Sequence, residues 1–264
     1  MALPPVLILR HVTGEPIGQT ADALAAAGLT TELWDMAACQ QRTFHPPHWA
    51  GLVAIGGPMN VDQVEQYPFL AQEIHWLREA VRAKVPVLGL CLGAQLLAKA
   101  LGARVGAAPA VEVGWHRVEF TAAGQQDPLL SDIPGPATVL QWHGDTFELP
   151  AGAVLLAAGA EFLAAGTENG ASGRQCTHQA FRFGELAWGI QFHAEIGAEQ
   201  IELWAKTPYD PHDRCAPGPE LRDQILSALP RELPGAQIIG RKILGRFGKL
   251  CREVAQARGK GNGG

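Results

Sequence analysis

The sequence has few of the features that mark disulfide-rich, membrane-spanning and secreted proteins. Its five cysteines are odd in number and scattered over positions 39, 91, 176, 215 and 251, which is a poor basis for a disulfide framework. No uncharged apolar run approaches the ~20 residues that a bilayer-spanning helix needs. No basic segment precedes the first apolar run, and Pro4 and Pro5 interrupt the approach to it. We therefore expect a cytoplasmic protein without a signal peptide and without a membrane partner.

Motifs for nucleotides and metals are also missing. The sequence has no Gly-x-x-x-x-Gly-Lys-[Ser/Thr] loop and no Gly-x-Gly-x-x-Gly opening a helix after a strand. Cys176 and His178 have no companion pair at a zinc-site spacing, while His45 and His48 lie near prolines in a loop. We therefore expect no cofactor and no bound metal.

Positive charge is concentrated at one end of the chain. The sequence has 21 Lys and Arg against 26 Asp and Glu, a net charge of −5. Residues 239–264 contain seven basic residues and one acidic residue, so this segment carries +6 and the remainder −11. Nucleic acid is not expected as a partner, because the whole protein is acidic and the basic segment lacks interleaved aromatic residues. With 47% hydrophobic residues, the chain should bury a sizeable core.

The first hundred residues alternate between strand and helix patterns. Short apolar runs predict buried strands at residues 6–9, 30–34, 51–55 and 86–90. Helical spacing of apolar residues predicts helices at residues 20–27, 69–84 and 92–101. This order predicts an α/β fold in three layers, with a mainly parallel central sheet and helices on both of its faces.

The second half of the sequence is richer in strands and ends in helices. Strand patterns separated by turn residues, which predict a small antiparallel portion, occur at residues 111–120, 137–142, 154–158, 174–183 and 187–192. Four prolines at residues 207–219 predict a boundary between a domain at 1–207 and a proline-rich linker with a helical extension at 208–264.

Two helices are expected in this extension, at residues 220–229 and 236–257. In the second helix one face is apolar and consists of Ile239, Ile243, Phe247, Leu250 and Val254. The opposite charge of the body favours packing of this face within the molecule or between copies of it. A separate protein partner and an anionic membrane are the alternatives.

The turn between the strand at 86–90 and the helix at 92–101 is the strongest signal for chemistry. The sequence Gly89-Leu-Cys91-Leu-Gly93 has the layout of a nucleophile elbow, in which a sharp strand-to-helix turn exposes one side chain. The N-terminus of a helix stabilises a negatively charged sulfur, and the N–H after the nucleophile can bind an oxyanion. A core cysteine that happens to lie between glycines is the alternative reading of Cys91.

Partners for such a nucleophile occur near the end of the strand-rich half. His193 follows directly on a predicted strand, and Glu195 stands two residues further on. A carboxylate at this spacing can orient the imidazole and stabilise its protonated form, as the acid does in a triad of nucleophile, base and orienting group. Taken alone, a histidine at a strand end is more often a solvated or capping residue.

Three separated segments resemble the class I glutamine amidotransferases, and especially their GMP-synthetase-like domain. The segments are Gly56-Gly57-Pro58, Gly89 to Gln95, and Gly189 to Glu195, and they occur in the same order and at the same spacing as in the family. The resemblance covers about residues 3–205 and implies a flavodoxin-like fold. One departure is visible, because the family usually has His-Pro-Glu where this sequence has Ala194 between His193 and Glu195.

The resemblance also implies roles for individual residues. Cys91 would attack the side-chain amide of L-glutamine, His193 would act as general base and acid, and Glu195 would orient His193. Gly57 and Leu92 would supply the N–H groups of an oxyanion hole, and Gln95 would hold the amino-acid end of the substrate. The remaining expected pocket residues are Gly114, Trp115 and His116, and the stretch from Gln141, Trp142 and His143 to Asp145.

Three functions are consistent with these residues. The first is a glutaminase subunit that passes ammonia to a separate synthase, because only about 45 residues follow Pro219 and no acceptor domain is recognisable among them. The second is a hydrolase of the same fold that cleaves γ-glutamyl amides or conjugates. The third is a binding or regulatory module without turnover, against which the presence of Cys91, His193 and Glu195 argues. Candidate protein partners are a synthase subunit and a second copy of the chain.

Overall fold

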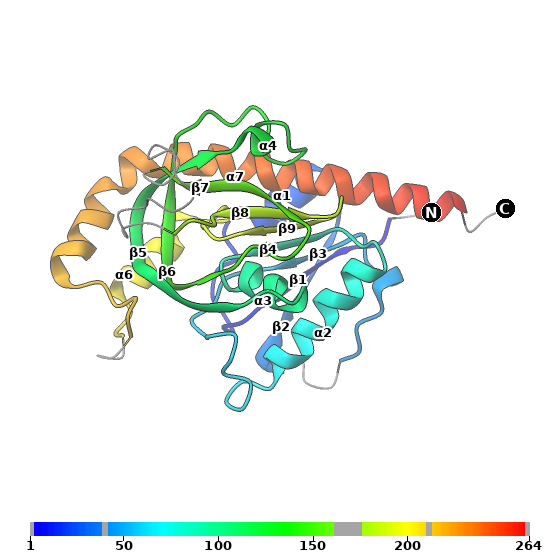
Figure 1. Cartoon of the computed structure of the whole chain (residues 1–264), viewed down its shortest axis with the longest axis horizontal. Helices are drawn as coiled ribbons and strands as arrows, with labels where there is room; N and C mark the ends of the chain where they lie inside the picture. The colour runs from blue at the N-terminus through cyan, green and yellow to red at the C-terminus, as the bar shows by residue number, and fades with distance from the viewer. Residues whose placement is uncertain (1–2, 39–41, 161–175, 210–212, 262–264) are drawn as a thin grey trace.

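The computed structural model describes residues 3–38, 42–160, 176–209 and 213–261, and the strands among them form one nine-stranded sheet (Figure 1). Their order across the sheet is β2-β1-β3-β4-β9-β8-β7-β5-β6. The strand bounds are β1 Val6–Arg10, β2 Thr31–Asp35, β3 Gly51–Ala54, β4 Val87–Leu90, β5 Val105–Phe120, β6 Ala137–Phe147, β7 Ala153–Gly159, β8 Ala180–Phe183 and β9 Ala187–Ile190. Arg174 and Gln175, where one strand was expected to begin, lie outside the described residues.

The strands β2, β1, β3, β4 and β9 pair in parallel. Their carboxyl ends therefore lie at the same edge of the sheet, and the residues that follow β1, β3, β4 and β9 are brought together there. The strand order changes direction at β1, which lies between β2 and β3. Open α/β sheets bind their ligands at such switch points, beyond the carboxyl ends of the strands.

The strands β8, β7, β5 and β6 extend the same sheet through antiparallel pairs. The longest pairing joins β5 to β6 and contains an irregularity between Ala107 and Glu112. Because of this pairing, Glu112 lies opposite His143. The predicted antiparallel portion is thus an extension of the parallel sheet.

Helices cover both faces of the sheet, which confirms the predicted three-layer α/β fold. One face carries α1 (Thr20–Ala26) and α7 (Pro219–Gly261), and the other carries α2 (Phe69–Arg82) and α3 (Leu92–Ala100). The alternation of side chains along a strand explains the division. In β1, Val6 and Ile8 belong to the core beneath α1 and α7, whereas Leu7 and Leu9 belong to the core beneath α2 and α3.

The shorter helices are α4 (Ala122–Gln125), α6 (Ala198–Lys206) and the 3₁₀ helices η1 (Met36–Ala38) and η2 (Pro46–His48). None of the helices in the described part of the chain is both long enough and apolar enough to span a membrane.

The C-terminal extension is one helix, so the prediction of two separate helices was wrong. Helix α7 continues through Pro230 and Pro234. A proline inside a helix removes one backbone hydrogen bond and frees a carbonyl one turn earlier. Both prolines are exposed, so water can reach this side of the helix, while Ile225, Leu233 and Ala236 on its other side are buried. Apolar packing before and after the two prolines therefore outweighs their local preference to end the helix.

The apolar face of α7 packs on the body of the same molecule (Figure 1). Ile243, Leu244, Phe247, Cys251 and Ala255 are buried in the core shared with α1 and the sheet. The buried stripe differs slightly from the expected one, since Ile239 and Leu250 are only partly buried at its border. Packing within the molecule, the arrangement favoured by the opposite charges, is confirmed.

Candidate active site

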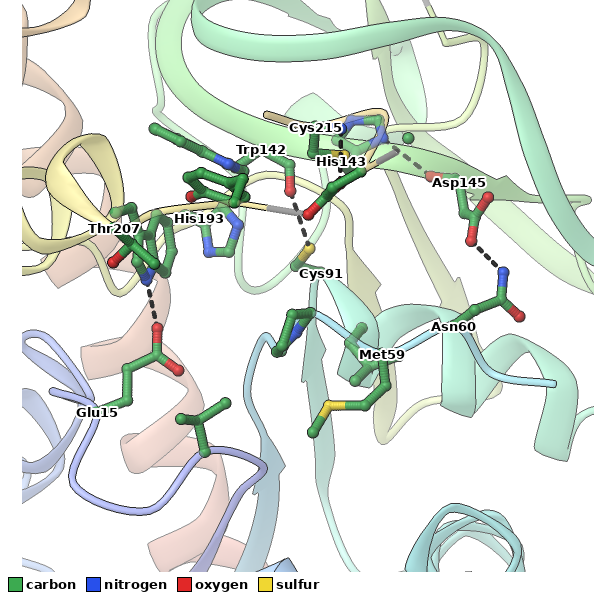
Figure 2. Close-up of a pocket in the computed structure, with 18 of the residues that line it drawn as sticks. Glu15, Met59, Asn60, Cys91, Trp142, His143, Asp145, His193, Thr207 and Cys215 are labelled. Atoms are coloured by element: carbon green, nitrogen blue, oxygen red, sulfur yellow. Dashed lines mark hydrogen bonds between the residues drawn. The ribbon is translucent and has the colours of Figure 1, made fainter. Parts of the chain in front are cut away.

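A pocket of about 740 Å³ opens beyond the carboxyl ends of β1, β3, β4 and β9 (Figure 2). It is lined by residues that follow these strands, by the end of β6, by α6 and by the proline-rich segment. Of the residues predicted to form a site, the lining includes Gly57, Cys91, Leu92, Gln95, Trp142, His143, Asp145 and His193.

Cys91 stands at the turn between β4 and α3 in a conformation that few residues other than glycine adopt. Its φ is 51° and its ψ is −110°. Backbone of this kind is strained and is found mainly where a site requires it. The glycines on both sides make the turn possible, because a Cβ on Gly89 would overlap the Gly93 carbonyl and one on Gly93 would overlap the Ala54 carbonyl. This is the geometry expected of a nucleophile elbow.

His193 and Glu195 follow β9 and form a close buried pair. The Nδ1 atom of His193 lies 2.7 Å from Oε1 of Glu195, and both side chains are almost fully buried. Because the carboxylate accepts the Nδ1 proton, Nε2 is the nitrogen left to exchange a proton with a nucleophile. Among the described residues Nε2 has no hydrogen-bond partner of ordinary geometry.

The electrostatic surroundings of His193 favour its protonated form. Burial alone would lower the pKa of His193, but the charges of Glu195 and Cys91 and the hydrogen bond to Glu195 raise it well above 6.5. Cys91 and His193 are neighbours, because both lie against Gly56 at the end of β3 and both line the pocket. A thiol beside an imidazole of this kind can transfer its proton and become a nucleophile.

Ala194, which stands where the family usually has proline, is held by hydrogen bonds instead. The side-chain amide of Gln19 donates to the Ala194 carbonyl over 3.1 Å, and the Gln19 N–H donates to the Glu195 carbonyl over 2.8 Å. Gln19 also donates to the Gln237 carbonyl of α7 over 3.3 Å. These contacts fix the backbone around Glu195 without the φ restriction of a proline.

Gly57 and Leu92 present backbone N–H groups at the pocket. Within the described part of the chain, neither N–H donates a hydrogen bond to another backbone group. A Cβ on the preceding Gly56 would lie 2.9 Å from Cε1 of His193 and 3.5 Å from Cβ of Cys91, so this strand end runs directly alongside both residues. Gly57 and Leu92 thus line the same pocket as Cys91, and their role as an oxyanion hole stays a prediction.

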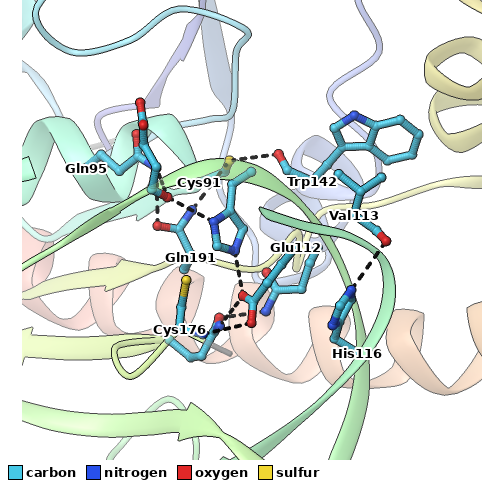
Figure 3. Close-up of polar contacts among 12 residues, drawn as sticks. Cys91, Gln95, Glu112, Val113, His116, Trp142, Cys176 and Gln191 are labelled. Atoms are coloured by element: carbon cyan, nitrogen blue, oxygen red, sulfur yellow. Dashed lines mark hydrogen bonds and ion pairs between the residues drawn. The ribbon is translucent and has the colours of Figure 1, made fainter. Parts of the chain in front are cut away.

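Gln95 connects the floor of the pocket to the end of β6. Its side-chain nitrogen donates to the Asp145 carbonyl over 3.1 Å and to Oε1 of Gln191 over 3.3 Å (Figure 3). The Gln191 amide in turn donates to Sγ of Cys91 over 3.7 Å. Since both hydrogens of the Gln95 amide are engaged with the protein, its Oε1 is the atom left for a donor group of a substrate.

His143 belongs to a buried network that lies next to the pocket. Its Nε2 is 2.9 Å from Oε2 of Glu112, and its Nδ1 is 2.9 Å from the Asp145 carbonyl. Glu112 also accepts the Cys176 N–H over 2.9 Å and the Gln179 amide over 2.8 Å (Figure 3). Burial alone would raise the pKa of Glu112, but the hydrogen bond and charge of His143 lower it.

Among the described residues, this network contains the group of side chains that most resembles a set of metal ligands. Ligand atoms of Glu112, His143 and Cys176 all lie within 4.8 Å of one another. However, burial and the charge of Glu112 raise the pKa of the Cys176 thiol to about 12, and Glu112 already accepts two hydrogen bonds and pairs with His143. The arrangement suits an ion pair that holds the end of β6 in place.

Four residues expected to bind the substrate, Gly114, Trp115, His116 and Gln141, are not among the residues that line this pocket, and their role stays a prediction. Gly114 faces Ile225 of α7, and Trp115 donates from Nε1 to the Ile225 carbonyl over 3.2 Å. His116 contacts the Val113 carbonyl, and the buried Gln141 donates to Gln179. The segment 114–116 lies on β5, which β9, β8 and β7 separate from the Cys91 strand β4 in the sheet.

Several pocket residues were not predicted from the sequence. Glu15 follows β1 and accepts a hydrogen bond from Nε1 of Trp204, opposite Cys91 in Figure 2. Tyr209 stacks on Trp142 with 6.3 Å between ring centroids, and Arg214 and Cys215 come from the proline-rich segment. The position of Glu15 after a parallel strand was a signal for the site, whereas nothing local marked the proline-rich segment.

Comparison with known proteins identifies the family. The profile of the family described as glutamine amidotransferase class-I matches residues 18–202, which is more than half of the chain. The chain therefore belongs to the class I glutamine amidotransferase family.

Bacterial relatives have names that refer to glutamine amidotransfer or glutamine hydrolysis. The glutamine amidotransferase-like protein YfeJ of Salmonella typhimurium is 33% identical over 154 residues, 57% of this chain and 59% of YfeJ. A glutamine-hydrolysing GMP synthase of Porphyromonas gingivalis is 33% identical over 148 residues, 55% of this chain and 25% of that enzyme. The chain thus spans less than two thirds of YfeJ and about a quarter of the GMP synthase.

Solved structures agree over nearly the whole chain. A glutamine amidotransferase from Thermotoga maritima superposes with a TM-score of 0.77 at 28% identity, covering 93% of this chain and 98% of the other. One from Methylobacillus flagellatus has a TM-score of 0.78 at 26% identity, with coverages of 94% and 95%. The described fold is therefore that of class I amidotransferases.

Proposed function

We propose that this protein is a cysteine-dependent glutaminase that hydrolyses the side-chain amide of L-glutamine to glutamate and ammonia. One observation carries the proposal: a strained Cys91 stands in a pocket beside His193, whose other nitrogen is 2.7 Å from Glu195. The charged side chains of the pocket have both signs, with Glu15, Asp213 and Arg214 among them. This suits a zwitterionic amino acid.

In the first half of the reaction, Cys91 would transfer its proton to Nε2 of His193 and attack the amide carbon of glutamine. The negative charge that develops on the amide oxygen would be stabilised by the N–H groups of Gly57 and Leu92. His193 would then give its proton to the leaving nitrogen, so that ammonia departs and a γ-glutamyl thioester remains on Cys91.

In the second half, a water molecule would attack the thioester while His193 accepts one of its protons. Collapse of this second tetrahedral intermediate would release glutamate and return the proton to the Cys91 sulfur. Glu195 stays ionised throughout, because its role is to hold the Nδ1 proton and stabilise the imidazolium. The ammonia would serve an acceptor enzyme, since the name of the Porphyromonas gingivalis relative joins glutamine hydrolysis to GMP synthesis.

A second candidate is hydrolysis of γ-glutamyl amides that carry a larger amine. The observation that favours it is the aromatic wall formed by Trp142, Trp204 and Tyr209 in a pocket of about 740 Å³. Such a wall can accept an apolar leaving group that glutamine lacks. Both reactions would use the same nucleophile and the same thioester.

Steady-state kinetics with glutamine and a panel of γ-glutamyl amides tests the proposal. We expect release of glutamate by the wild-type protein, loss of more than ~10³-fold in kcat/KM in Cys91→Ala, and normal rates in the control Cys251→Ala. A kcat/KM at least ~10-fold higher for a γ-glutamyl amide than for glutamine would favour the second candidate. Absence of turnover together with absence of acylation at Cys91 would contradict both.

A further inference from the structure

A second buried histidine lies behind the loop that carries Gly57. His11 follows β1 and is 2% exposed, and its partner Glu73 of α2 is fully buried. The Nδ1 atom of His11 is 2.9 Å from the Gly56 carbonyl oxygen, and its Nε2 is 2.9 Å from Oε2 of Glu73. Neither residue lines the pocket, and the reaction described above uses neither of them.

The contacts of His11 determine where its protons lie. A carbonyl oxygen can only accept a hydrogen bond, so Nδ1 of His11 must carry a proton and donate a hydrogen bond to Gly56. This holds whether the proton between His11 and Glu73 lies on Nε2 or on the carboxylate. Burial alone would lower the pKa of His11, but the charge and hydrogen bond of Glu73 and the bond to Gly56 raise it. Glu15 is the other charged group that acts on His11, and it also favours the protonated ring.

The bond to the Gly56 carbonyl fixes the orientation of the Gly57 N–H. These two groups belong to one planar trans peptide, in which the C=O and N–H bonds point in opposite directions. When His11 holds the carbonyl on one side, the N–H is aimed to the other, where Gly57 borders the pocket. His11 also packs directly on Gly57, since a Cβ there would lie 2.8 Å from Cβ of His11. Hydrogen bonding at the carbonyl further polarises the peptide and strengthens its N–H as a donor.

We infer that His11, held by Glu73, is a positioning residue for the oxyanion hole, because it orients and polarises the Gly56–Gly57 peptide from behind. The inference rests on the proposed function in assigning an oxyanion to the Gly57 N–H. The contacts of His11 connect α2 with the end of β3, since Glu73 is 62 positions and Gly56 is 45 positions away from His11 in the sequence.

Two isosteric substitutions separate this role from mere packing. The side-chain nitrogen of asparagine occupies about the position of Nδ1, so His11→Asn keeps a donor for Gly56 and loses the contact with Glu73. The longer glutamine places its nitrogen near Nε2, so His11→Gln keeps the contact with Glu73 and loses the donor for Gly56. Both variants lose the same charge, and the same two substitutions at the exposed His75 of α2 serve as controls.

The test compares glutamine hydrolysis with alkylation of Cys91 by iodoacetamide, a displacement that develops no oxyanion. We expect His11→Gln to lower kcat by ~10- to 100-fold with KM within ~3-fold, while His11→Asn stays within ~5-fold of wild type. The rate constant for alkylation should change by less than ~2-fold in both variants. Equal losses in the two variants, or parallel losses of hydrolysis and alkylation, would overturn the inference.

An NMR measurement tests the same inference and does not depend on enzymatic turnover. The amide resonance of Gly57 should move in His11→Gln and keep nearly its wild-type shift in His11→Asn, because only the first variant loses the donor to Gly56. A Gly57 resonance that is unchanged in His11→Gln would contradict the role of His11. Failure of the wild-type protein to hydrolyse any substrate, with these shifts as expected, would instead contradict the proposed function alone.

Discussion

The carboxylate of Glu195 decides which nitrogen of His193 is available to Cys91. With Oε1 of Glu195 at 2.7 Å from Nδ1, Nδ1 keeps its proton in both charge states of the ring, and Nε2 is the nitrogen that gains and loses one. An uncharged acceptor at this position would stabilise the imidazolium less and would allow the other tautomer. The His193 side chain is 3% exposed, so water cannot replace the carboxylate.

We therefore predict that Glu195→Gln lowers kcat/KM for glutamine by ~10²- to 10⁴-fold while the protein remains folded. Steady-state kinetics and a thermal melt check the two halves of this prediction. Glu199→Gln changes an exposed carboxylate four residues away and should leave the kinetics unchanged. Kinetics of Glu195→Gln close to wild type would remove Glu195 from the triad.

The ion pair between Glu112 and His143 should make stability depend on pH. Since the pKa of Glu112 is lower in the folded protein than its ordinary value of 4.5, its contribution is fully present above pH 4.5 and is lost as pH falls through the folded pKa. Removing one partner of a buried ion pair costs about 3 kcal/mol.

We predict that Glu112→Gln lowers the free energy of unfolding by about 3 kcal/mol near pH 7, and that this difference shrinks below pH 4.5. Urea unfolding at a series of pH values measures it. The exposed Glu148 provides a control, because Glu148→Gln should change stability little at any pH. A difference that grows on acidification would show that Glu112 is not held ionised by His143.

Helix α7 contributes to the core that it shares with α1 and the sheet. Phe247 is fully buried there, together with Ile243 and Cys251. On the same helix, Ile238 is 52% exposed. Phe247 and Ile238 therefore offer a matched pair, one buried and one exposed, for measuring how much the packed face of α7 contributes to stability.

Phe247→Ala should lower the free energy of unfolding by about 3–5 kcal/mol, whereas Ile238→Ala should change it by less than about 0.5 kcal/mol. Thermal and urea unfolding of both variants provide the measurement. If Phe247→Ala melted at the wild-type temperature, the helix would not be packed on the body, and its apolar face would be free for a partner or a membrane.

The elements most faithfully predicted from the sequence were those whose packing follows from local pattern. The apolar spacing of Leu70, Ile74 and Leu77 predicted a helix at 69–84, and α2 spans Phe69–Arg82. The continuity of α7 could not be predicted, because Pro230 and Pro234 argue against it locally and only the tertiary packing overrides them.

In the active site, too, residues marked by a local sequence pattern could be predicted, and residues that depend on the tertiary structure could not. Cys91 and His193 could be singled out because the elbow and the strand end are local patterns. Glu112 and His11 could not, since each acquires its meaning from a partner distant in sequence, as His11 does from Glu73 62 residues away. The surroundings of residues 114–116 could not be predicted either, because no local pattern encodes the strand order that places β5 between β7 and β6.

The division of the chain at residue 207 stays a prediction. Residues 213–215 line the pocket, and α7 shares a core with α1 and the sheet. The active site and the C-terminal extension are therefore parts of one packed structure in the described residues, and the extension closes one side of the pocket. This arrangement places a second thiol, Cys215, in the same pocket as Cys91.

The presence of Cys215 makes one labelling experiment decisive for the account. Burial and the charge of Asp213 raise the pKa of the Cys215 thiol to about 12, so it stays protonated near neutral pH. We predict that an electrophilic analogue of glutamine, followed by peptide mapping, labels Cys91 and none of the other four cysteines, and that excess glutamine slows the labelling. Label on Cys215, or on any other cysteine with Cys91 left free, would contradict the assignment of Cys91 as the nucleophile.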